Sequence, residues 1–249
     1  MEKVLEVCVD SLESALAAKA GGADRLELCA NLVIGGTTPS LSLLKAVKGE
    51  TGLPVHALIR PRFGDFLYTE REFALMLEDA EALLEAGADA LVSGFLTAEG
   101  GLDSARMEKL ISLAHSGGRK FTLHRAFDVC KDPLAALKNC RDWGVDTVLT
   151  SGQAPSCTEG IELIKELFAE AGEVELLLGA GVNAEAIRKV REEIPQAGSF
   201  HMSGKEVLES AMIYRKEGVS MGLPGLSEFE IWRTSEETIR KAREELDRA

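Results

Sequence analysis

Short apolar segments alternate along this chain with longer amphipathic segments. The short segments are rich in Val, Leu and Ile, a composition typical of buried parallel strands. The longer segments have the pattern of helices that bury one face, and examples are Ser11–Ala20, Glu70–Ala86, Ser104–His115 and Pro133–Trp143. Such alternation predicts parallel strands joined by helical crossovers. The predicted strands lie near 3–9, 24–28, 55–59, 89–93, 120–124, 146–150, 174–178 and 198–202.

A weak internal repeat supports this count of strands. Gly22-Ala23-Asp24, Gly87-Ala88-Asp89 and Gly144-Val145-Asp146 each stand between a helical segment and a strand. Glycine suits the position after a helix, where a left-handed conformation closes the last turn. Since a βα unit takes roughly 30 residues, two units fit between successive repeats. We therefore expect a single (β/α)8 barrel of the TIM type over residues 1–249, with an irregular segment at 204–233 before a final helix. An open doubly wound sheet is the alternative.

Composition narrows the classes of partner. The chain is 45% hydrophobic and 28% charged, as globular proteins are, and its net charge of −13 argues against a nucleic-acid partner. No apolar run approaches the roughly 20 residues that span a bilayer, so no membrane association is expected. The first residues lead straight into a predicted strand and not into the apolar stretch of a signal peptide, which favours a cytoplasmic location. The five cysteines (8, 29, 130, 140 and 157) are odd in number and contain no Cys-x-x-Cys, so reduced thiols are expected.

Polar residues gather where the predicted strands end, which is where barrel enzymes place their functional groups. Three arginines, Arg60, Arg62 and Arg125, could converge on a carboxylate or phosphate. Further candidates for binding such an anion follow strands six to eight, and they are Ser151, Gly179, Gly181, His201 and Ser203. The alternative is that the arginines neutralise Glu6, Glu27 and Asp128, and that the glycines serve only turns.

A proton-transfer role is predicted for His124 or Glu27, with Asp128 orienting the histidine. Such groups would suit a lyase or isomerase that acts on a small phosphorylated or carboxylated metabolite. The loop at 60–69 is long for a βα loop and carries three aromatic residues, so it could cover the site.

Two Glu-x-Cys segments suggest a different ligand. Glu6 and Cys8 share one face of the first strand, and Glu27 and Cys29 share one face of the second. If both pairs point inward, two thiolates and two carboxylates converge, and the soft thiolates would select Cu(I), with zinc as a competitor. The alternative is that each cysteine is a small buried apolar residue.

Several motifs are similar to those of the CutC copper homeostasis family. They run in order from residue 3 to about 203 and comprise Glu6-x-Cys8, Gly22-Ala23-Asp24-Arg25-Leu26-Glu27-Leu28-Cys29, Gly35-Gly36-x-Thr38-Pro39-Ser40, Ile59-Arg60-Pro61-Arg62-x-Gly64-Asp65-Phe66, His124-Arg125-Ala126-Phe127-Asp128, Leu149-Thr150-Ser151-Gly152-Gln153, Gly179-Ala180-Gly181-Val182 and His201.

The resemblance implies a (β/α) barrel, a cytoplasmic location and a role in copper tolerance or Cu(I) binding. It also implies self-association as a homodimer or a larger assembly, with Cys8 and Cys29 at the positions of the family's candidate copper ligands. The chain departs from the family pattern at Thr37, where Leu is usual, and at Phe63, where Gly is usual.

Overall fold

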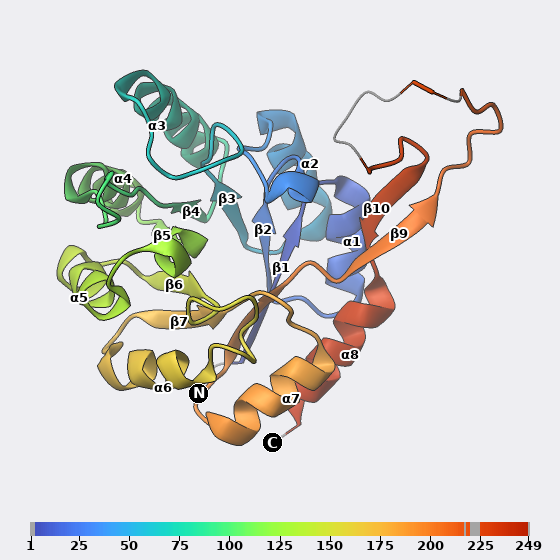
Figure 1. The fold of residues 1–249 in the computed structure, drawn as a ribbon. Coiled ribbons are helices and arrows are strands. Elements are labelled where there is room, and N and C mark those ends of the chain that lie inside the picture. The colour runs from blue at the N-terminus through green and yellow to red at the C-terminus, as the bar shows by residue number, and fades with distance from the viewer. Residues whose placement is uncertain (1–2, 217, 220–224, 249) are drawn as a thin grey trace.

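Eight parallel strands close into a barrel in the order in which they occur along the chain (Figure 1). This computed structural model describes residues 3–216, 218–219 and 225–248. Strand β1 pairs with both β2 and β8, which closes the sheet, confirms the TIM-type barrel and excludes the open sheet. The strands are β1 (Val4–Val9), β2 (Arg25–Leu28), β3 (Val55–Leu58), β4 (Ala90–Ser93), β5 (Lys120–Leu123), β6 (Thr147–Thr150), β7 (Glu175–Leu178) and β8 (Ser199–Met202).

The helices form a ring around the barrel (Figure 1). Two short 3₁₀ helices, η1 (Leu32–Ile34) and η2 (Arg125–Val129), lie in the loops that follow β2 and β5. No helix among the described residues has both the length and the apolar composition needed to cross a membrane. The helices are α1 (Leu12–Ala20), α2 (Leu41–Thr51), α3 (Glu70–Glu85), α4 (Ser104–Ser116), α5 (Pro133–Trp143), α6 (Ile161–Glu170), α7 (Ala184–Glu193) and α8 (Glu236–Asp247).

The internal repeat is a structural device used three times. Its glycines have positive φ angles and follow helices, and these angles are 94° at Gly22, 100° at Gly87 and 77° at Gly144. The aspartate of each repeat accepts a hydrogen bond from a backbone N–H of the preceding strand, and these bonds join Leu5 to Asp24 (2.7 Å), Val55 to Asp89 (2.8 Å) and Phe121 to Asp146 (2.8 Å). Each repeat therefore ends a helix and fastens the next strand beside its neighbour.

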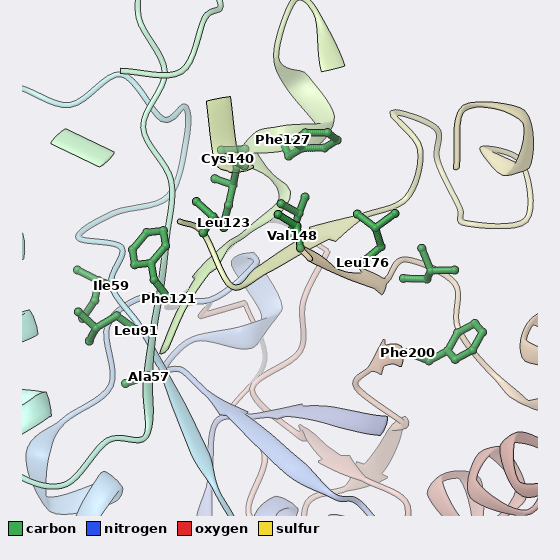
Figure 2. Packing of buried hydrophobic residues seen from close by; sticks show 14 of the residues in the cluster. Ala57, Ile59, Leu91, Phe121, Leu123, Phe127, Cys140, Val148, Leu176 and Phe200 are labelled. Carbon is green, nitrogen blue, oxygen red and sulfur yellow. The ribbon is translucent and has the colours of Figure 1, made fainter. Parts of the chain in front are cut away.

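The larger apolar cluster lies between the barrel and the helices. Apolar side chains on the outer face of the strands pack against the helices, and those labelled in Figure 2 include Leu91, Phe121, Val148, Leu176 and Phe200. Because strand side chains alternate between faces, the intervening residues point inward. Many of these inward residues are polar and buried, and they include Glu6, Arg25, Glu27, His56, Thr122, Thr147 and Ser199. Barrels of this type are more often filled with branched aliphatic side chains.

Glu6 lies at the centre of a network of charges inside the barrel. Its carboxylate is 2.6 Å from Arg25 Nε and 2.7 Å from His201 Nδ1. Arg25 reaches onward to Glu175, with its terminal nitrogens 3.2 Å from both carboxylate oxygens. Burial alone would raise the pKa of Glu6, but Arg25 and His201 overcome burial and hold this pKa well below its usual value.

The sequence predicted an irregular segment at residues 204–233, but the structure has a strand at each end of this segment. The segment begins with strand β9 (Lys205–Glu209) and ends in β10 (Glu230–Thr234), which pair as an antiparallel hairpin and project beyond the helical ring (Figure 1). At the base of the hairpin, Lys205 Nζ lies 3.7 Å from the centroid of the Trp232 ring. All five residues of β9 are exposed, so this strand lacks the apolar alternation that marks a buried one.

We predict that Arg25→Met lowers the free energy of unfolding by about 3–5 kcal/mol, because it leaves the Glu6 carboxylate buried without its main counter-charge. Urea denaturation followed by circular dichroism measures this loss. The control is Lys241→Met, which removes an exposed ion pair with Glu237 and is expected to cost less than about 1 kcal/mol. Equal losses in the two variants would contradict a structural role for the internal network.

Candidate functional site

A cavity of about 540 Å³ opens at the C-terminal ends of the strands. This volume lies within the range of small-molecule sites. Part of its wall is apolar and is formed by Leu58, Phe66, Leu149, Val182 and Trp232. The polar residues that line it are Cys8, Glu27, Arg60, His124, Arg125, His201, Ser203 and Lys205.

The structure does not bring the three candidate arginines together. Arg60 and Arg125 line the cavity, but Arg62 does not. The Nε of Arg62 instead contacts Glu72 at 2.6 Å, on helix α3. Arg125 is already paired, because its Nε lies 2.7 Å from Asp128 and its side chain also donates to Ser151 Oγ at 2.9 Å.

Arg60 is a buried cation without a carboxylate partner in the described part of the chain. Its residue is 7% exposed, and its guanidinium donates to the backbone oxygens of Gly35 (3.2 Å), Gly36 (3.0 Å) and Gly64 (3.0 Å). Its Nε is buried with no hydrogen-bond partner among the described residues. The nearby Tyr68 hydroxyl supplies no negative charge, since burial raises the pKa of Tyr68. The loop thus holds the guanidinium in place and leaves its charge unmatched.

Asp128 lies outside the cavity and does not orient His124. It is buried and accepts hydrogen bonds from Thr150 Oγ1 at 2.6 Å and from the backbone N–H of Ser151 at 3.0 Å, besides its pair with Arg125. Ser151 also lies outside the cavity, and its Oγ donates to Ala154 O at 2.6 Å. Asp128 and Ser151 therefore fasten η2 to the end of β6.

His124 and Glu27, the other two predicted catalytic residues, both line the cavity. The pKa of His124 is lowered to about 3 by burial and by the nearby Arg60. Burial raises the pKa of Glu27 to about 7. One carboxylate oxygen of Glu27 has no hydrogen-bond partner among the described residues.

Glu6, whose role the sequence left open, joins Glu27 and His201 in a cluster. One ligand-type atom from each of the three lies within 4.8 Å of the others. Glu6 and His201 lie together because they are opposite each other in the register of β1 and β8. This register could not be deduced from the sequence. Both oxygens of Glu6 already contact Arg25 or His201, so a metal ion would have to displace a charged partner.

Cys8 and Cys29 occupy different environments. Cys8 lines the cavity, whereas Cys29 is fully buried and packs with Leu58 and Val92. Each thiol lies 3.6 Å from a backbone oxygen, that of Met202 for Cys8 and that of Val9 for Cys29. Cys8 stands opposite Glu27 in the β1–β2 register, and Cys29 lies two residues after Glu27, just beyond the end of β2. From strand geometry the two Cα atoms are about 8 Å apart. Burial raises the pKa of Cys29 well above its ordinary value, and electrostatic repulsion from Cys8 raises it further.

The glycine loop after β7 contributes backbone to the cavity. Gly181 lines the cavity and has φ 71°, and the preceding Ala180 has φ 65°, which is unfavourable for a residue with a Cβ. Gly179 lies outside, where a Cβ would come within 2.7 Å of Leu149 Cδ1, so it serves close packing. Ser203 lines the cavity from the end of β8.

Comparison with known proteins gives consistent matches. The model of the CutC family matches residues 3–205. The family protein CutC of Salmonella schwarzengrund is 46% identical to this chain over 220 residues, which are 88% of this chain and 86% of that protein. The family protein CutC of Chromobacterium violaceum is 43% identical over 250 residues, which span the full length of both proteins. A solved structure from Streptococcus agalactiae, provisionally named copper homeostasis protein CutC, has a TM-score of 0.75 and 31% identity and covers 81% of this chain and 98% of that one.

We predict that Glu27 contributes more to the stability of the folded protein at acidic pH than at neutral pH. Its pKa is about 7 in the folded protein and near 4.5 otherwise, so between these values the folded state holds a proton that the unfolded state has lost. The free energy of unfolding should therefore fall by about 3 kcal/mol, from this residue alone, as pH rises from 4.5 through 7.

Urea denaturation at a series of pH values measures this slope. The slope in wild type also contains an opposite contribution from His124, whose pKa is lowered, so the contribution of Glu27 is the difference in slope between wild type and Glu27→Gln. Glu206→Gln, which changes an exposed carboxylate on β9, should leave the slope unchanged. The same slope in wild type and Glu27→Gln would contradict the assignment.

Proposed function

This chain belongs to the CutC family, and we propose that the cavity in its barrel binds a small carboxylated or phosphorylated molecule and acts on it as a lyase or isomerase. The observation that carries the proposal is Arg60, a buried guanidinium with no carboxylate partner in the described part of the chain. A buried charge without a counter-charge is strongly unfavourable. A bound anion would supply the missing charge, and the cavity has the volume for a metabolite.

Glu27 supports the assignment of a proton-transfer reaction. Its carboxyl borders the cavity, has one oxygen with no hydrogen-bond partner among the described residues, and has a pKa of about 7 because of burial. A group that titrates near neutral pH can both accept and return a proton under physiological conditions. Lyases and isomerases that act next to a carboxylate or carbonyl group need such a group.

The second candidate is copper homeostasis through Cu(I) binding at Cys8 and Cys29. The name of the Streptococcus agalactiae relative supports it, as do the positions of Cys8 on β1 and of Cys29 directly after the neighbouring β2. A two-thiolate site needs metal–sulfur distances of roughly 2.3 Å, so Cu(I) binding would require Cys29 to lose its proton and to move toward the cavity.

This second candidate includes a reducing, cytoplasmic setting and assembly of the chain into a homodimer or larger oligomer. Five free cysteines, all buried, support the reducing setting.

For the proposed anion site, we predict that inorganic phosphate and succinate bind wild type saturably and bind Arg60→Met at least about tenfold more weakly, because a charge-assisted hydrogen bond is lost. Isothermal titration calorimetry measures the affinities. Arg62→Met is the matched control, since this arginine lies in the same loop but pairs with Glu72 outside the cavity. If Arg60→Met bound both anions as tightly as wild type, the proposed anion site would be wrong.

For copper, we predict that wild type binds one Cu(I) in anaerobic competition with a chromogenic chelator and that the double variant Cys8→Ser/Cys29→Ser does not. The matched control is Cys130→Ser/Cys157→Ser, which changes two buried thiols that do not line the cavity. Equal Cu(I) affinity in wild type and Cys8→Ser/Cys29→Ser would remove the cysteines from consideration as copper ligands.

A further inference from the structure

His124 is held in one orientation at the rim of the cavity. It follows β5 directly, is 6% exposed and lines the cavity. Its ring packs against Phe66 with the centroids 4.8 Å apart. The ring also leaves no room for a side chain at Gly94, where a Cβ would lie 2.8 Å from His124 Nδ1. The imidazole therefore has little freedom to rotate.

The hydrogen bonds of His124 fix the position of its proton. The backbone N–H of Ala126 donates to His124 Nδ1 at 3.2 Å, so Nδ1 acts as an acceptor. In a neutral imidazole the proton must then sit on Nε2. Nε2 is buried and has no hydrogen-bond partner among the described residues. This N–H is a buried donor at the wall of a cavity, and leaving such a donor without an acceptor is unfavourable.

The surroundings of His124 keep the ring uncharged. Arg60 faces it as a cation, while Phe66, Leu123 and Gly94 contribute no charge on the sides that they cover. Burial and Arg60 lower the pKa of His124 to about 3. A ring in this state does not act as a base near neutral pH, but it can donate one hydrogen bond to an oxygen atom.

Arg60 and His124 contact the same aromatic ring. Arg60 Cζ lies 5.4 Å from the centroid of Phe66, and the His124 centroid lies 4.8 Å from it. A ligand carboxylate paired with Arg60 would therefore place its neighbouring atoms beside His124. An oxygen on the adjacent carbon is the group that Nε2 would meet. Preorganised donors of this kind stabilise negative charge that develops on a carbonyl oxygen.

We propose that Arg60 and His124 together bind a 2-oxo acid, with the carboxylate held by Arg60 and the adjacent carbonyl oxygen accepting a hydrogen bond from His124 Nε2. This inference rests on the proposed anion site and names its class of substrate. In this arrangement His124 polarises the carbonyl group and does not move a proton, which differs from the acid–base role that its position after a strand suggested.

Binding of matched probes tests the assignment. Calorimetry would compare pyruvate and 2-oxoglutarate with lactate and 2-hydroxyglutarate, in which a hydroxyl replaces the carbonyl, and with inorganic phosphate. Wild type should prefer the oxo acids. His124→Phe should weaken oxo-acid binding by about ten- to a hundredfold and leave phosphate affinity unchanged, because only the bond to the carbonyl is lost. His124→Gln retains an N–H donor and should restore part of the loss.

Nitrogen-15 NMR of the imidazoles provides a readout on unmodified protein. The resonances of His124, assigned by their loss in His124→Gln, should report the neutral form with its proton on Nε2 from about pH 5 to pH 8. The Nε2 signal should shift when pyruvate is added.

The outcomes separate this inference from the proposed function. Phosphate binding that depends on Arg60, combined with no preference for oxo acids or no effect of His124→Phe, would overturn the role of His124 alone. A proton on Nδ1, or a cationic ring at pH 7, would do the same. No binding of any anion to wild type would overturn both the anion site and this inference.

Discussion

The ion pair between Glu6 and Arg25 is the interaction on which the interior of the barrel depends. It lies almost fully buried, with Glu6 Oε2 2.6 Å from Arg25 Nε. Glu6 also orients His201, and Arg25 also holds Glu175, so the pair ties together β1, β2, β7 and β8. Buried ion pairs contribute little net stability because desolvation offsets attraction. The apolar packing between strands and helices must therefore stabilise the fold, which leaves the barrel interior free to carry charge.

Charge is balanced in this inner network and unbalanced at the rim of the cavity above it. Glu6, Arg25, Glu175 and His201 satisfy one another through short contacts. At the C-terminal rim, Arg60 has a guanidinium fixed by backbone oxygens and no described carboxylate beside it. This contrast between a balanced network inside the barrel and the charge of Arg60 at the cavity is the basis of the anion site that we propose.

Much of the fold could be predicted from local patterns. Each predicted strand boundary lies within one residue of the observed one, because a buried strand between two helices has a composition that is visible locally. The hairpin of β9 and β10 could not be predicted in this way, since every residue of β9 is exposed and β10 shows no alternation of buried and exposed positions. Its pairing depends on contact between segments that are distant in the sequence.

Much less of the site could be predicted, because the direction of a side chain after a strand depends on the loop. Arg60 and Arg62 are two residues apart and share a face by simple alternation, yet Arg62 turns away to Glu72 on α3. Asp128 lies four residues after His124, but the short helix η2 directs it to β6. The sequence placed His124 correctly at the rim, whereas its tautomer depends on a backbone N–H two residues later.

A crystal structure of the protein soaked with a 2-oxo acid shows whether a ligand satisfies the charge of Arg60. We expect the carboxylate at the guanidinium of Arg60 and the oxo group about 3 Å from His124 Nε2. A cavity that holds only water, with Arg60 and His124 hydrogen-bonded to it while the acid is present at high concentration, would contradict the proposed anion site.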